Sequence, residues 1–172
     1  KAPTLSIGAG FDYQHDAVMD APSDLDGARA VARKGTVRDA VGVSADVFVD
    51  VPFGPDKDHE FVAMAGLFWY DHGNELKYAG DGTRSVVPSR NSGIGLLGEV
   101  GYRWTFIEPV FAVDWFHGRQ DGRDLLGVKG GLNFWIRNAA VNVKTEFGAQ
   151  KTGDLASAPW IKCFTTQAQL FF

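Results

Sequence analysis

Apolar and polar residues alternate along most of this chain with a period of two. In the segment AVGVSADVFVDV, residues 40–51, valine or alanine occupies every second position from Val41 to Val51, and polar residues such as Asp46 and Asp50 take the other parity. Side chains of a strand point alternately to two faces, whereas helical side chains recur every three or four residues. The pattern therefore predicts an amphipathic β-strand.

The same alternation predicts eight strands of about ten residues or slightly more. They span residues 4–14, 38–52, 60–71, 92–104, 107–117, 124–136, 139–151 and 160–172. Tilted strands of about ten residues are long enough to cross the hydrocarbon of a bilayer. The strand over 60–71 is apolar on both faces, so the pattern leaves its register open. No domain boundary interrupts the series, and residues 1–172 are interpreted as one unit.

The connections between the predicted strands alternate in length. Short turns are predicted at Thr105–Phe106, at Arg137–Asn138 and in the segment FGPDKDH, and longer polar loops at 15–37, 72–91, 118–123 and 152–159. Short turns on one side and long loops on the other are typical of antiparallel up-and-down outer-membrane β-barrels, in which the turns face the periplasm. On that interpretation both termini lie on the periplasmic side.

The distribution of residues on the two faces favours a barrel with lipid outside. Aromatic residues lie toward the strand ends of the apolar faces, as they do at the two interfaces of a membrane. The predicted interface aromatics are Phe11, Tyr13, Trp69, Trp115 and Phe147 near the long loops, and Tyr102, Trp104, Phe134 and Phe172 near the short turns. The polar faces carry charges at mid-strand, which the water in a lumen would solvate. The predicted pore-lining residues are Asp12, Asp46, Asp50, Glu99, Arg103, Glu108, Asp114, Lys129, Lys144 and Glu146.

The composition and charge exclude several classes of function and structure. The formal net charge is −4 and no segment clusters Lys or Arg, which argues against a nucleic-acid partner. The single cysteine, Cys163, excludes an internal disulfide and a zinc site built on cysteines. The longest apolar run, Phe61–Tyr70, is shorter than the roughly 18 residues that a spanning helix needs. No cofactor is expected.

Three histidines near the long loops raise the question of catalysis. His15, His72 and His117 lie close in sequence to Asp16, Asp71 and Asp114. A hydrolase needs a nucleophile and a base within hydrogen-bond reach, and no spacing here enforces that. We therefore expect no enzyme. The acidic segment 20–26 lacks the glycine turn and closing glutamate of a calcium loop, so we expect no metal site.

From Pro3 to Phe172 the chain resembles the C-terminal part of the phosphate-selective porin family of Gram-negative bacteria. The stretches that carry the resemblance are PTLSIGAGFDYQ, ADVFVDVPFG, GIGLLGEVGYRW, GVKGGLNFWIRNAAVNVKTEFG and QAQLFF. The resemblance implies a homotrimeric channel of about sixteen to eighteen strands, of which this chain supplies the C-terminal half. The closing TTQAQLFF also resembles the C-terminal strand signal that outer-membrane barrels present to the barrel-assembly machinery.

One feature departs from that family, which is known for a ladder of Arg and Lys that draws phosphate inward. The predicted lumen positions here hold seven acids and three bases, so we expect a mild preference for cations. The sequence thus predicts a porin-like channel in the bacterial outer membrane for passive diffusion of small hydrophilic solutes or ions, with outer-membrane lipid around it.

Two alternatives remain open. One is a free-standing eight-stranded outer-membrane barrel with a structural or adhesive role, and the other is a soluble lipocalin-like binder. An eight-stranded barrel has an interior filled by side chains, whereas barrels of about sixteen strands hold water. The predicted interior is rich in glycine and has surplus acids, which favours the wider channel.

Overall fold

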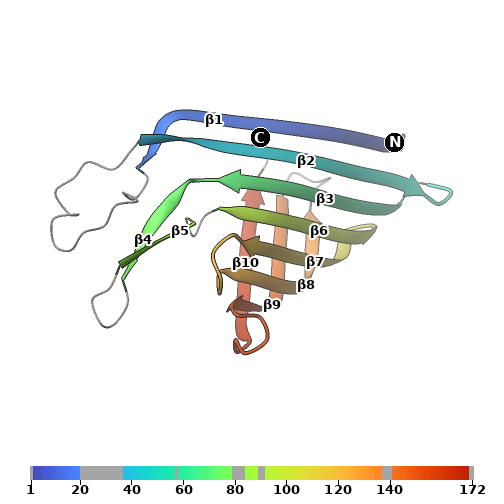
Figure 1. The fold of residues 1–172 in the computed structure, drawn as a ribbon. Helices are drawn as coiled ribbons and strands as arrows, with labels where there is room; N and C mark the ends of the chain where they lie inside the picture. The colour runs from blue at the N-terminus through green and yellow to red at the C-terminus, as the bar shows by residue number, and fades with distance from the viewer. Residues whose placement is uncertain are drawn as a thin grey trace.

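The computed structural model describes residues 2–19, 37–56, 58–78, 84–88, 92–136 and 141–170, which form an all-β structure (Figure 1). Eight antiparallel strands form the main sheet, each beside the strand next to it in the chain, apart from a hairpin inserted after β3. In order across the sheet they are β1 (Thr4–Met19), β2 (Val37–Phe53), β3 (His59–Asp71), β6 (Gly93–Trp104), β7 (Ile107–Gly118), β8 (Asp124–Ile136), β9 (Val141–Gly153) and β10 (Ile161–Leu170). The described residues include no helix long and apolar enough to cross a membrane.

The eight predicted up-and-down strands are confirmed, and three of the predicted connections differ. β1 runs to Met19, into the predicted loop 15–37, whose remaining residues up to 36 lie outside the described part of the chain. The predicted loop 72–91 contains a two-stranded sheet of β4 (Asn74–Tyr78) and β5 (Arg84–Pro88). These strands have 5 residues each, too short for alternation to stand out from the surrounding polar sequence.

The third difference concerns the predicted long loop at 118–123. β7 ends at Gly118 and β8 begins at Asp124, so this connection is as short as the one between Phe53 of β2 and His59 of β3. The predicted alternation of short turns and long loops therefore fails at this hairpin. The predicted turn at Arg137–Asn138 lies outside the described residues.

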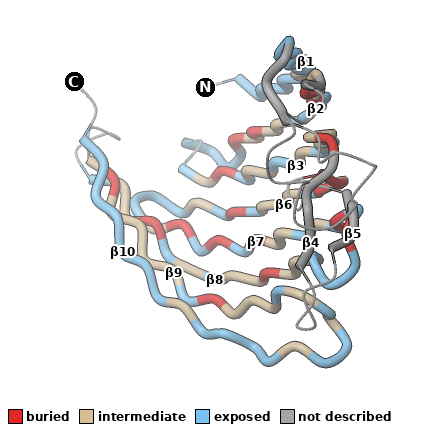
Figure 2. Tube along the Cα trace, turned by 60° about the vertical axis from the view of Figure 1, so that its left-hand side comes forward, coloured by how far each residue is buried: buried red, intermediate tan, exposed pale blue. Residues whose placement is uncertain are grey.

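The main sheet is curved and open. β1 and β10 are its two edges in the described chain, so the predicted closed barrel is not observed. Figures 1 and 2 show β8, β9 and β10 turned across the direction of β1, β2 and β3, so that the sheet wraps around one concave face. Eight alternating strands bring the chain back to the side on which it starts. We call the rim with turns 54–58 and 105–106 the turn rim, and the opposite one, with 72–91 and 119–123, the loop rim.

Strand pairing settles the register of β3, which the sequence leaves open. Trp69 pairs with Val43 on one side and with Ile94 on the other. The odd-numbered residues from Phe61 to Trp69 therefore lie on the same face as the apolar residues of the two neighbouring strands. Met64 pairs with Glu99 and belongs to the charged face. Each of the two faces of the sheet is thus continuous from β1 to β10.

Candidate functional site on the concave face

In a soluble β-sandwich the apolar faces of the sheets are buried and the polar faces are exposed. In this sheet large apolar side chains are exposed, and several polar side chains of the other face are buried. Every strand of the main sheet exposes large apolar side chains on its apolar face, for example Phe11, Val47, Leu67, Val100, Phe111, Leu132, Phe147 and Phe164. The buried polar strand residues of the described chain lie on the opposite, concave face. They are Asp50, Glu60, Glu108, Asn133 and Asn142. Figure 2 shows buried segments between exposed and intermediate ones along the inner strands of the sheet, whereas β10 at one edge is exposed almost throughout.

All ten residues predicted to line a pore share the concave face. Register pairs connect them through the sheet, as when Asp46 pairs with Gly66, which pairs with Leu97, which pairs with Asp114. The structure adds Glu60 of β3, which the sequence could not assign because the register of that strand was undetermined. Glu60 pairs in register with Arg103 and forms an ion pair with it.

Charge pairs on this face lie within a strand, between adjacent strands and, in one case, between strands that are not adjacent. Lys144 Nζ of β9 lies 3.4 Å from Glu99 Oε2 of β6, although β7 and β8 separate the two strands, and 3.0 Å from Glu146 Oε1. Lys129 Nζ lies 2.9 Å from Asp114 Oδ2. Side chains three strands apart can meet in this way only because the sheet curves toward them. The curvature therefore builds a charge network that sequence spacing does not indicate.

A cavity of about 310 Å³ opens on the concave face near the turn rim. Its lining residues are Phe48, Asp50, Glu60, Val62, Met64, Glu99, Arg103, Glu108, Asn133 and Trp135. The indole Nε1–H of Trp135 donates to Glu108, and the guanidinium of Arg103 lies 5.1 Å from the centre of the Trp135 ring. Residues from five strands therefore converge here, with four carboxylates against one guanidinium.

Aromatic side chains occupy the concave face closer to the loop rim. Phe68 stacks on Phe116 with ring centres 6.3 Å apart, and contacts Tyr70 at 5.5 Å. Glycine makes room for these rings, because a Cβ at Gly95 would collide with the Phe68 ring and one at Gly42 with Tyr70. The sequence analysis missed this cluster, and the glycines of neighbouring strands are the signal that would have found it.

The predicted interface aromatics lie on the apolar face, with two qualifications. Phe147 is the central residue of β9 and does not lie near a loop, and Phe172 lies outside the described residues. The sequence analysis also missed His59 at the turn rim. Its ring stacks between Phe53 and Trp104, and its Nδ1 lies 2.7 Å from the Tyr102 hydroxyl.

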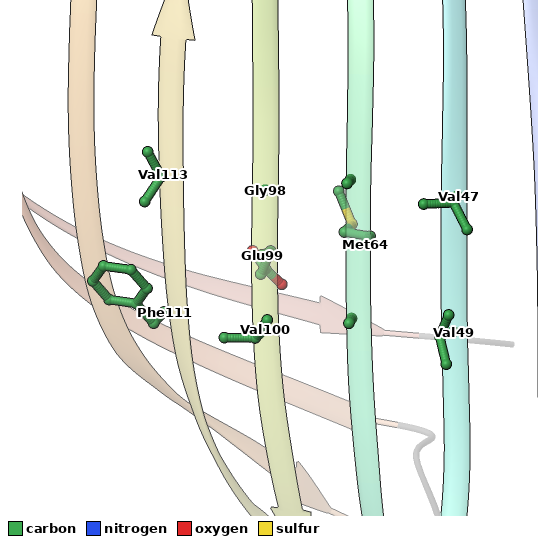
Figure 3. A pocket seen from close by; sticks show the side chains of 10 residues that line it. Val47, Val49, Met64, Gly98, Glu99, Val100, Phe111 and Val113 are labelled. Carbon is green, nitrogen blue, oxygen red and sulfur yellow. The ribbon is translucent and has the colours of Figure 1, made fainter.

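The apolar face is hollowed around Gly98 in the middle of β6 (Figure 3). The hollow measures about 390 Å³. Val47 and Val49 line it on one side and Phe111 and Val113 on the other, while a Cβ at Gly98 would meet no atom within 4 Å. In Figure 3 the C-terminal strands pass behind the hollow, so this face points away from the concave side.

Two of the histidines near the loop rim lie beside acids. His15 Nδ1 lies 2.8 Å from Asp39 Oδ1 and His117 Nδ1 lies 2.9 Å from Asp124 Oδ1. The side chain of Asp16, the sequence neighbour of His15, lies outside the described part of the chain. The backbone N–H of His72 donates to Ser92 Oγ. Among the described residues, no three His, Cys, Asp or Glu side chains are placed to hold a metal ion.

The turn after β9 is closed by an aspartate. Asp154 Oδ1 accepts from the backbone N–H of Ala156 at 3.0 Å, and Oδ2 accepts from the Ser157 hydroxyl at 2.9 Å. These two hydrogen bonds, with a smaller contribution from the positive charge of Lys151, hold the pKa of Asp154 below its usual value. The ionised carboxylate therefore stabilises this turn.

Comparisons with protein-family models, with curated proteins and with solved structures find no match for this chain. Its fold and its two faces are therefore the basis on which a function can be argued.

Proposed function

We propose that this chain forms part of the wall of a porin-like channel in the bacterial outer membrane, through which small hydrophilic solutes or ions diffuse passively. The observation that carries the proposal is the apolar face, on which large side chains are exposed on all eight strands of the main sheet. Soluble monomers rarely expose contiguous apolar patches larger than a few hundred Å². Lipid is the environment in which such a face is stable, and the charged concave face then borders water.

The open edges support a wide barrel. Within hydrocarbon, each unpaired N–H or C=O of an edge strand costs several kcal/mol, so a membrane sheet must close on itself. β1 and β10 are edges in the described chain. We propose that further strands complete the wall, to a total of about sixteen to eighteen, as the resemblance to phosphate-selective porins implies. A homotrimer and recognition of the C-terminal strand by the assembly machinery belong to the same proposal.

The charge of the concave face supports a preference for cations. With Glu60 included, eight acids and three bases share this face among the strand side chains that the structure describes. A ring of carboxylates raises the local concentration of cations and lowers that of anions. The described side chains of these strands include no counterpart of the basic ladder of the resembled family.

Conductance measurements test the proposal. The full-length protein is inserted into a planar bilayer under a gradient of KCl, and we expect stepwise conductance with a reversal potential of the sign that marks K⁺ selectivity. Absence of conductance from correctly folded protein would refute the channel. A reversal potential that marks chloride selectivity would agree with a channel but would refute the assignment of its selectivity to this face.

A further inference from the structure

We propose that the cavity near the turn rim is a binding site for a small organic ammonium ion with an apolar body. The site lies on the face assigned above to the channel lumen, so its role in selecting permeant cations rests on that proposed function. Binding of the ammonium ion in the cavity does not depend on that function.

The described lining residues include more acidic than basic side chains. Asp50, Glu60 and Glu108 are buried, with 8%, 3% and 5% of their surface exposed, and Glu99 is half-buried. Arg103 is the one cation among the lining residues that the structure describes, and it forms an ion pair with Glu60. Lys144 reaches Glu99 from outside this set but is shared with Glu146. By formal charge, the described lining residues thus hold four carboxylates and one guanidinium.

A buried amide provides an independent indication of a ligand. Asn133 lines the cavity, has 7% of its surface exposed, and its Oδ1 has no hydrogen-bond partner in the described part of the chain. It pairs in register with Glu108 on one side and with Lys144 on the other. A buried acceptor without a partner is costly, and a ligand N–H would satisfy it.

The shape and walls of the cavity specify an organic cation. A bare divalent metal needs several oxygens at about 2.0–2.6 Å, and no such group occurs among the described residues. A volume of about 310 Å³ lies in the range of small-molecule sites. Phe48, Val62, Met64 and Trp135 provide apolar wall, and aromatic faces attract cations. An ammonium group would face the carboxylates and Asn133, with its apolar body against these side chains.

Three probes of similar size and different charge test the inference. The full chain is folded in detergent and titrated by calorimetry with benzylammonium, benzyl alcohol and benzoate, which carry charges of +1, 0 and −1. We expect benzylammonium to bind about tenfold or more tightly than either of the others, since hydrogen bonds to charged groups are the strong ones. Equal affinities, or tighter binding of benzoate, would overturn the proposal.

Variants locate the site. Glu99→Gln removes one negative charge with little change of shape, and we expect binding to weaken about fivefold or more. Asp12→Asn is the matched control, because Asp12 is an exposed carboxylate of the same face on β1. This variant should bind benzylammonium with the same affinity as the unmodified chain. Equal effects of the two variants would show a diffuse field instead of a site.

A third variant separates a ligand contact from a structural role. Asn133→Leu removes the acceptor that lacks a partner, so we expect folding stability to stay equal or rise while benzylammonium binding falls. Unchanged binding with unchanged stability would overturn the role of Asn133. Because these titrations need no ion flow, binding without conductance would refute only the channel, and conductance without binding would refute only this site.

Discussion

Arginine substitutions at two consecutive residues of β3 test which face of the sheet meets lipid. Ala65 is exposed on the apolar face, where it pairs with Val47 and Gly98, and Met64 is exposed on the concave face, opposite Glu99. Both positions accept a longer side chain, since Ala65 borders the hollow around Gly98 and Met64 borders the cavity of the concave face. Ala65→Arg and Met64→Arg thus add the same charge at the same level of the sheet, on opposite faces.

The position of Ala65 sets the expected magnitude. It is the central residue of β3, a strand of 13 residues, so six residues lie on each side. At about 3.3 Å per residue and a tilt of about 40°, Ala65 lies ~15 Å along the membrane normal from each strand end, which is close to the bilayer midplane. Arginine on the lipid face there costs about 2–4 kcal/mol. Met64→Arg gains a cross-strand pair with Glu99, so its net effect should stay below about 1 kcal/mol.

Unfolding by urea in phospholipid vesicles, followed through the fluorescence of the 5 tryptophans, measures both variants. Ala65→Arg should lower the folding equilibrium constant by about 30- to 1000-fold relative to Met64→Arg, because each 1.4 kcal/mol is about tenfold. If water bathes the apolar face, both substitutions should stay within about 0.5 kcal/mol of the unmodified chain. Equal effects would refute the proposed orientation.

Three further predictions follow from individual contacts. Gly95→Ala should destabilise the sheet by about 1–3 kcal/mol, because the new Cβ would collide with the Phe68 ring. Gly98→Ala on the same strand should be neutral or stabilising by up to ~1 kcal/mol, because a Cβ there meets no atom. Similar urea midpoints for the two variants would contradict this prediction. Thr105 has a φ of 54°, which is unfavourable for a β-branched residue, so Thr105→Asn should raise stability by up to about 1 kcal/mol, and a lower unfolding midpoint would count against the left-handed turn. The pKa of Asp154 is lowered in the folded chain, so the stabilising effect of its carboxylate is complete above the usual aspartate pKa of 3.8 and is lost as the pH falls through the lower folded pKa. Asp154→Asn should remove this component from the pH dependence of stability, and identical pH profiles for the two chains would contradict it.

The sequence predicted the strands well because the information is local. Alternation with period two depends only on neighbouring residues, and it located all eight strands of the main sheet and assigned the ten charged positions to one face. It failed where alternation is absent or short, in the register of β3 and in the hairpin of β4 and β5. It also overestimated the loop after β7, because Gly118 belongs to the strand.

The candidate site was predictable only in part. Asp50, Glu99, Arg103 and Glu108 were assigned to the lumen face, but nothing in their spacing indicates that they surround one cavity with Asn133. The cavity depends on pairing between strands far apart in the sequence and on the curvature of the sheet.

The sequence by itself determined the strands and the polarity of their faces, since side-chain direction follows from position along a strand. The tertiary structure alone decided which faces join, how strongly the sheet curves and which charges meet. The contact between Lys144 and Glu99 shows the reason, because it spans 45 residues of sequence and two intervening strands. Such a contact is fixed by the register and curvature of the whole sheet, which no local pattern encodes.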